Sequence, residues 1–350
     1  MVLTRAYVTH PNQLIPLPSF RQNPELGIMF FQTMFPGNEE ILLRSRLYVI
    51  CGILVLIPNT ICLVVFNSSK DFRQRFVFFT LLSVSDMING ISFIMSGAGR
   101  LDLILHEKYY IKISSYECMT EYLWPAFLLF GGQLPATFHC LLTVERVLAV
   151  NRVSWYRSCW TWRHRLYLSS LGICSCVFLS FIAFFVSSAS PTINENRMCA
   201  VMDSTGIVYG TIHYCWIACS YMIAFAVTLN LFVKSHGSKF LNHTERRKQM
   251  AILILSGINV LMVSVPNFVL VADQWHADEF DVLLVGVAYL LYGFQSCFNL
   301  PIFYFFRLEF RRRCHQLLRF RQPGSNTIVS NDISRQKLSR VHASFVNTAI

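Results

Sequence analysis

Charged residues are scarce in this chain. They account for 14% of its 350 residues, whereas hydrophobic residues account for 54%. A soluble globular domain usually carries roughly 25% charged residues. The few charges are also unevenly spaced, because long windows without any charged residue recur along the sequence. This pattern argues against a single soluble domain and predicts an integral membrane protein.

The sequence also lacks the patterns that mark catalytic and metal sites. Among its 12 cysteines no Cys-x-x-Cys pair recurs with zinc spacing, and no nucleophile stands with a matching base. We therefore expect no enzymatic activity, no metal site and no cofactor. Most cysteines lie in apolar windows, where a buried packing role is expected. No cleavable signal peptide is evident, so the first apolar window is expected to direct membrane insertion.

Seven apolar windows are long enough to cross a bilayer. A hydrocarbon core of about 30 Å requires about 20 helical residues, and backbone groups in lipid must pair within their own segment. We therefore predict an all-α integral membrane protein, a seven-transmembrane helix bundle in residues 47–306. Residues 1–46 form the predicted amino-terminal segment and residues 307–350 the predicted tail. The predicted spans are residues 47–68, 76–98, 122–144, 166–188, 207–233, 249–272 and 282–306.

The positions of the basic residues predict the orientation. If the amino terminus is extracellular, the three inner loops and the tail carry 22 of the 30 Lys and Arg residues, and the outer segments carry 8. Cytoplasmic loops are normally the basic ones. The net charge of +11 is therefore expected to face the anionic inner leaflet of the plasma membrane and a cytoplasmic partner, with no nucleic acid bound.

A short amphipathic helix is predicted after the seventh span. Residues 307–320 place apolar side chains at helical spacing among five arginines, a pattern typical of a helix that lies along the membrane surface. Cys314 follows three of these arginines. This setting is typical of a palmitoylated cysteine, although an unmodified interfacial cysteine fits the pattern equally well.

Asp86 is the one charged residue inside the second predicted span. An acid at that depth costs about 2.5 kcal/mol or more to insert, which makes it a candidate functional residue. It is expected to face the interior of the bundle and to meet polar side chains there, with Asn59 and Asn299 as the expected partners. The alternative is a protonated acid that only joins helices through hydrogen bonds.

An acid and a base are adjacent at the inner end of the third predicted span. Glu145 and Arg146 are expected to pair with each other in a resting state, and the arginine is expected to meet a cytoplasmic partner once it is released. The alternative is a charge pair that merely ends the span.

Taken together, the order and depth of these motifs resemble the rhodopsin-like G protein-coupled receptors. Leu82 to Asp86 is similar to the family's Leu-x-x-x-Asp motif, and Glu145-Arg146 is similar to its Asp/Glu-Arg-Tyr motif. The seventh span ends with Asn299, Pro301 and Tyr304, similar to Asn-Pro-x-x-Tyr. The resemblance covers residues 45–320 and includes the kink proline of the sixth span and the two bridging cysteines, here Pro266, Cys118 and Cys199.

Several motif positions depart from the family pattern. Val147 follows the arginine instead of a tyrosine, an additional residue separates Asn299 from Pro301, and Ser264 stands where a tryptophan usually precedes the proline. Such departures resemble the divergent serpentine chemoreceptor families of nematodes.

The resemblance implies a chemosensory receptor that binds an extracellular small molecule and activates a heterotrimeric G protein. It implies a disulfide between Cys118 and Cys199. It further implies an activation switch formed by the inner-end and proline motifs, namely Glu145, Arg146, Pro266, Asn299, Pro301 and Tyr304.

The outer halves of the helices offer a candidate ligand pocket. The third span has no acid between Leu123 and Val144, so a primary amine would lack its usual anchor. We expect an apolar pocket with a few hydrogen-bonding groups, although each aromatic residue on its own is also explained by packing. The candidate residues are Trp124, Phe127, Phe130, Gln133, Tyr209, His213, Tyr214, Tyr289 and Tyr292.

Two other kinds of protein match parts of this sequence. A receptor for a peptide or small transmitter is favoured by the four acids from Asp273 to Asp281. A transporter or channel would instead require several charges within the membrane and broken helices in repeated halves. The single intramembrane acid and the lack of a repeat count against a transporter.

Overall fold

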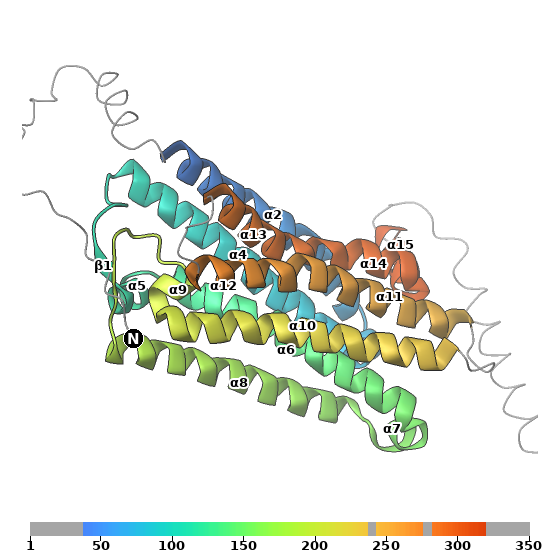
Figure 1. Cartoon of the computed structure of the whole chain (residues 1–350). Coiled ribbons are helices and arrows are strands. Elements are labelled where there is room, and N and C mark those ends of the chain that lie inside the picture. The colour runs from blue at the N-terminus through green and yellow to red at the C-terminus, as the bar shows by residue number, and fades with distance from the viewer. Residues whose placement is uncertain (1–37, 237–242, 276–281, 320–350) are drawn as a thin grey trace, which may run out of the picture.

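Long helices dominate the structure. A computed structural model describes residues 38–236, 243–275 and 282–319, and in these residues the chain forms an elongated bundle of helices (Figure 1). Six helical segments of this part of the chain are long and apolar enough to span a membrane. Five of them are the single helices α2 (Asn38–Asn67), α4 (Val77–Leu105), α6 (Trp124–Asn151), α8 (Trp162–Ala189) and α10 (Ile207–His236).

The sixth long segment is helical but irregular. It consists of α11 (His243–Asn259), the π-helical turn η1 (Val260–Ser264) and α12 (Val265–Trp275). Pro266 lies at the second position of α12, directly after η1. Proline has no N–H group to donate and its ring displaces the preceding turn, so a wide π-helical turn just before it relieves the conflict.

The segment predicted as the seventh span is divided. Residues 282–306 form α13 (Val282–Phe294), the 3₁₀ turn η2 (Gln295–Phe298) and α14 (Asn299–Phe306), and none of these parts is long enough to count among the six segments above. The described residues therefore show six long apolar segments, and the seventh predicted span stays a prediction. The division has a local cause. Pro301 has no backbone N–H to donate, and the turn before it tightens to a 3₁₀ helix. The amphipathic helix α15 (Leu308–Arg319) follows in the predicted place.

Short elements gather at the two ends of the bundle (Figure 1). One end carries the antiparallel pair β1 (Ile113–Ser114) and β2 (Ile193–Asn194) with the helices α5 (Ser115–Glu121) and α9 (Val201–Thr205); we call it the disulfide end. The other carries α3 (Lys70–Arg75), α7 (Val153–Cys159) and α15; we call it the basic end.

Helices α2 and α4 lie against each other along their length because glycines remove the side chains between them. A Cβ atom added to Gly52 would lie 2.5 Å from the carbonyl oxygen of Gly90, and one added to Gly97 would lie 2.6 Å from the carbonyl oxygen of Ser45. Small residues of this kind permit close helix packing in a membrane, where water does not drive the helices together.

The outer surface is as apolar as a membrane requires. Helix α8, whose apolar window is only 22% buried within the bundle, exposes Phe178, Phe181 and Phe185. Polar groups instead face inward, and the buried set includes Asn59, Asp86 and His139. This inside-out distribution identifies the chain as a multi-pass integral membrane protein.

The helices extend beyond several predicted span limits. Helix α2 begins at Asn38 and α4 continues to Leu105, whereas the predicted spans begin at residue 47 and end at residue 98. A charged residue limits the part of a helix that can lie in lipid, but it does not end the helix. The predicted amino-terminal segment up to residue 37 and the tail from residue 320 lie outside the described residues.

Candidate functional site

The disulfide implied by the family resemblance is present. Cys118 in α5 and Cys199 just before α9 are bonded, with their Cα atoms 5.5 Å apart. The Ser114 hydroxyl caps the start of α5, and the Glu117 side chain accepts a hydrogen bond from the Ser114 N–H in return. These backbone and side-chain bonds lower the pKa of Glu117, which keeps the cap charged. The disulfide ties the segment before α9 to α5, the helix that precedes α6.

Asp86 lies at the centre of a buried polar network, as predicted. Its carboxylate accepts hydrogen bonds from the Ser296 hydroxyl at 2.7 Å and from the Asn299 amide at 2.6 Å. The Asn299 amide also donates to the Asn59 side-chain oxygen at 3.3 Å, and Asn59 donates to the Ser296 carbonyl at 3.2 Å. The network thus joins α2, α4 and the η2–α14 junction. Sequence reasoning missed Ser296, whose signal was its position one turn before Asn299.

A second polar cluster lies between α6 and α11. The His139 ring bonds to the Ser256 hydroxyl at 3.0 Å and lies 3.5 Å from the Asn259 amide. His139 packs against Tyr221 of α10, with the ring centroids 5.2 Å apart. Since His139 and Tyr221 are both buried, this cluster links α6, α10 and α11 inside the bundle.

Part of the predicted ligand pocket comes together between α6, α10 and α13. The Gln133 amide lies 3.1 Å from the His213 ring, and the hydroxyls of Tyr214 and Tyr289 are 2.6 Å apart. The Tyr209 hydroxyl donates to the Leu179 carbonyl at 2.7 Å. Tyr292 belongs to the same region, because its hydroxyl would lie 2.5 Å from a Cβ atom added to Gly132.

The remaining predicted pocket residues lie elsewhere. Phe127 is exposed on the outside of the bundle, and Phe130 packs against the core toward the basic end. Trp124 is buried, but its ring stacks on Tyr122 with a centroid distance of 4.2 Å and packs against the backbone at Gly99. The structure therefore does not bring these three aromatic residues to the polar cluster of Gln133 and His213. A helix places only one face toward the interior, so aromatic content alone could not assign them.

Two buried arginines near the disulfide end were missed by sequence reasoning. Arg44 of α2 and Arg100 of α4 expose only 9% and 4% of their surface. The Arg44 Nε donates to the Tyr48 hydroxyl at 2.7 Å, and the Arg100 Nε donates to the Met198 carbonyl at 2.8 Å. In the sequence both arginines resembled ordinary charges at the ends of spans.

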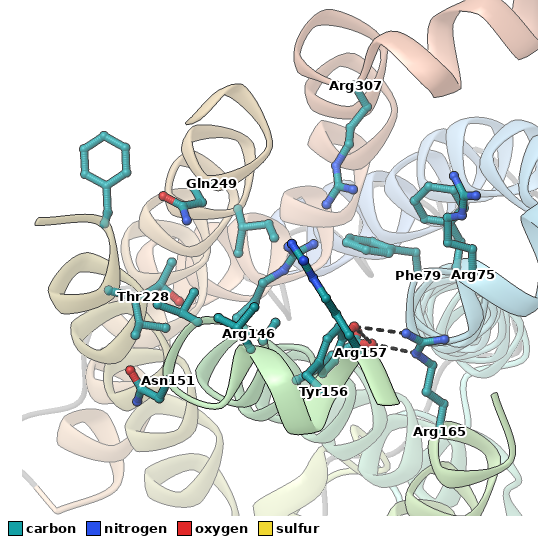
Figure 2. A pocket seen from close by; sticks show the side chains of 18 of the residues that line it. Arg75, Phe79, Arg146, Asn151, Tyr156, Arg157, Arg165, Thr228, Gln249 and Arg307 are labelled. Carbon is teal, nitrogen blue, oxygen red and sulfur yellow. Dashed lines mark hydrogen bonds and ion pairs between the residues drawn. The ribbon is translucent and has the colours of Figure 1, made fainter. Parts of the chain in front are cut away.

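A cavity of about 770 Å³ opens at the basic end (Figure 2). Its wall comes from α3, α4, α6, α7, α8, α10, α11 and the α14–α15 junction. Six basic and two acidic side chains line it, so its field is positive. The basic residues are Arg75, Arg146, Arg157, Arg165, Lys234 and Arg307, and the acidic residues are Glu145 and Glu309.

Glu145 does not pair with Arg146 in this structure, so the pairing predicted for a resting state is not seen here. Its carboxylate accepts hydrogen bonds from Arg165 Nε at 2.6 Å, from the Tyr156 hydroxyl at 2.9 Å and from Trp160 Nε1 at 3.2 Å. Adjacent residues on a helix point in different directions and cannot face each other. Arg165 also donates to the Tyr156 hydroxyl, so these four residues form one cluster, the Glu145 cluster. Burial, together with the Glu145 charge, raises the pKa of Tyr156 and keeps its hydroxyl protonated.

Arg146 turns into the cavity instead, where Arg157 and Arg307 also reach (Figure 2). Its Nε is buried and has no hydrogen-bond partner among the described residues. Tyr304, the last of the predicted switch residues, lies 3.3 Å from the His315 ring of α15. Pro266 and Pro301 each follow an irregular turn, as described above.

Helix α15 lies against the basic end of the bundle by its apolar face. Phe310 is buried between Phe66 and Phe303, with ring centroids 5.1 and 5.8 Å away. Cys314 is partly buried on the same face, and burial raises the pKa of its thiol. The Arg313 side chain anchors α15 to the end of α2 through bonds to the hydroxyl and carbonyl of Ser68.

Comparison of the chain with models of known protein families finds no match, and comparison with curated proteins also finds none. In residues 38–236, 243–275 and 282–319 no group of three or more His, Cys, Asp or Glu side chains could hold a metal ion.

Proposed function

We propose that this protein is a chemosensory G protein-coupled receptor of the rhodopsin-like type. The cavity at the basic end carries the proposal, because Arg146 projects into it from α6 between α10, α11 and the α14–α15 junction. A cavity of about 770 Å³ with a positive lining is large enough for the end of a partner helix. The Asp86 network and the Cys118–Cys199 bond support the same class of protein.

The divided helix from Val282 to Phe306 is the proposed seventh span. Its three parts follow each other without a break in the helical run, and together they are as long as a bilayer requires. Ser296 of η2 and Asn299 of α14 donate hydrogen bonds to Asp86, so these two polar side chains are satisfied inside the bundle. In this proposal the disulfide end is extracellular and the basic end is cytoplasmic.

Activation in this proposal is a shift between two packings of one bundle. A ligand at the disulfide end favours the packing that it binds more tightly. The turns η1 and η2 lie beside prolines and are the places where the sixth and seventh segments can change shape. Movement of α11 away from α6 widens the cavity, and Arg146 then contacts a heterotrimeric G protein.

Nucleotide exchange on purified G proteins tests the proposal without a known ligand. The full-length protein in lipid nanodiscs is mixed with a panel of heterotrimers, and GTPγS uptake is compared with that of empty discs. We expect basal exchange on at least one heterotrimer, lost in Arg146→Ala and kept in Arg163→Ala. Arg163 is a suitable control because it is exposed at the start of α8 and does not line the cavity. Equal exchange in Arg146→Ala and the parent protein would exclude this cavity as the coupling site.

Epitope tags test the proposed orientation. A tag at the amino terminus should bind antibody on intact cells, and a tag at the carboxyl terminus should bind only after permeabilisation. Staining of the carboxyl-terminal tag on intact cells would reverse the assignment of the two ends.

A further inference from the structure

The two buried arginines near the disulfide end form a site that the family resemblance does not include. The guanidinium carbons of Arg44 and Arg100 each lie 5.5 Å from the centroid of the Tyr48 ring. The two guanidinium carbons are therefore at most twice 5.5 Å from each other. Tyr289 of α13 is also near Arg44, whose guanidinium carbon is 5.4 Å from the centroid of that ring. Three separate helices thus surround one pair of cations.

No carboxylate of the described residues forms an ion pair with either arginine. The acid whose charge acts on the same tyrosines, Asp203, accepts a hydrogen bond from the Ala200 N–H instead. The ion pairs of the described residues include neither arginine, and the Nη2 atom of Arg44 is buried without a hydrogen-bond partner there. Tyr109 is near both guanidinium groups, but burial raises its pKa to about 12 although the two arginines oppose that change. Its hydroxyl therefore stays neutral at pH 7 and supplies no counter-charge.

Snorkelling to the membrane surface does not explain the two side chains. An arginine near a span end normally extends its head group into water. Arg46, two residues after Arg44 on the same helix, is exposed in this way, whereas Arg44 and Arg100 are buried. Burial of a guanidinium without an ion-pair partner costs several kcal/mol, so an anion that reached this pair would be held favourably.

The surroundings define what kind of anion fits. The arginines supply planar hydrogen-bond donors, which match a carboxylate. The walls are aromatic, because Tyr48 is in edge contact with Phe93 and Tyr289, and Tyr289 with Tyr214. A ligand that satisfies both features has one carboxylate and an apolar body.

We propose that Arg44 and Arg100 bind the carboxylate of a small organic acid whose apolar body lies among the tyrosines of α2, α10 and α13. As the binding site of a receptor ligand it rests on the proposed function, and it names the class of that ligand. The same residues would set the specificity, since a neutral analogue would leave both cations unpaired.

Thermal unfolding of the full-length protein in nanodiscs tests this proposal directly. The probes are hexanoate, benzoate, phenylacetate and 4-phenylbutyrate, each compared with its neutral amide at constant ionic strength and pH 7.4. We expect acids of this set to raise the unfolding temperature more than their amides do. The concentration that gives half of this rise should increase about 10-fold or more in Arg44→Gln and in Arg100→Gln, as expected for loss of one charge-assisted contact.

Matched variants separate binding from folding. Arg46→Gln removes an exposed arginine of the same helix and should leave the response to acids unchanged. Arg44→Lys keeps the charge but loses the planar donors, so an intermediate response is expected, and it serves if Arg44→Gln does not fold. The proposal is overturned if no acid stabilises more than its amide, or if the glutamine variants respond as the parent does.

Failure of the anion site can be distinguished from failure of the proposed receptor function. Acid binding without G protein exchange on any heterotrimer would refute the receptor assignment and leave the anion site intact. Exchange that depends on Arg146, with no preference for acids, would support the receptor and refute the anion site.

Discussion

Replacing Glu145 by glutamine is the sharpest test of the Glu145 cluster. Three hydrogen bonds converge on one carboxylate oxygen, and the ion pair with Arg165 is nearly closed to water, since the two side chains are 11% and 14% exposed. Glutamine keeps an oxygen that can accept these bonds but removes the charge. A hydrogen bond to a charged group contributes about 1.5–3 kcal/mol and a neutral one about 0.5–1.5 kcal/mol. The loss is therefore about 1–1.5 kcal/mol for each bond weakened by removal of the charge.

This loss is expected to appear as ligand-independent signalling. The cluster joins α6, α7 and α8 at the wall of the cavity, so in the proposed mechanism it stabilises the resting packing. A change of one or two kcal/mol shifts a two-state equilibrium about 5- to 30-fold. Basal GTPγS uptake in Glu145→Gln should rise within that range, and Arg165→Gln should act in the same direction. Uptake is to be compared at equal amounts of folded receptor, with exposed Arg163→Gln as the matched control.

A different result would refute this reasoning. If Glu145→Gln and Arg165→Gln unfold at a lower temperature than the parent while basal uptake stays at the parent's level, the cluster is a structural clamp with no part in switching. A rise in uptake in Arg163→Gln of the same size would show that loss of surface charge alone explains the effect.

Three further predictions concern other parts of the bundle. Asp86→Ala leaves the Ser296 hydroxyl and the Asn299 amide without their acceptor and should lower the free energy of unfolding by about 1–3 kcal/mol. Asp86→Asn should lower it less, and thermal unfolding compares the two variants. Loss of the Cys118–Cys199 bond in a double serine variant should cost about 2–4 kcal/mol and reduce delivery to the cell surface, and peptide mapping under non-reducing conditions should find that disulfide in the parent. Acyl-exchange labelling should detect a thioester on the parent protein and lose it in Cys314→Ala; unchanged labelling would place the lipid elsewhere.

The positions of the long helices could be predicted from charge spacing alone. Lipid excludes unpaired charges, so each charge-free window corresponds to the part of a helix that the bilayer can hold. The helix ends could not be predicted in this way. Asn38 and Leu105 lie beyond the apolar windows because a helix continues into water wherever its backbone bonds are satisfied. The division at η2 has a local signal in Pro301, but its extent depends on the packing of Ser296 and Asn299 against Asp86.

The polar contacts were predictable only where one chain of reasoning led to one partner. Asp86 had to find polar groups at its own depth, and the few asparagines of neighbouring spans limited the choice. Several arginines lie near Glu145 at the basic end. Arg165 forms the ion pair because the fold of α7 brings it to Glu145. Arg44 and Arg100 carried no signal at all, since the sequence does not distinguish an arginine that turns inward from one that turns toward water.

The 3₁₀ turn η2 gives the proposed seventh span a motion other than bending. A 3₁₀ helix has 3.0 residues per turn and an α-helix 3.6, so each residue of η2 is wound about 20° further than in a regular helix. Over the four residues Gln295–Phe298 this amounts to about 80°. If η2 relaxed to a regular α-helix, α14 would rotate about its own axis relative to α13 and carry Asn299 away from Asp86. Such a change would work as a screw, altering which side chains α14 presents at the basic end while the axis of the helix stays in place.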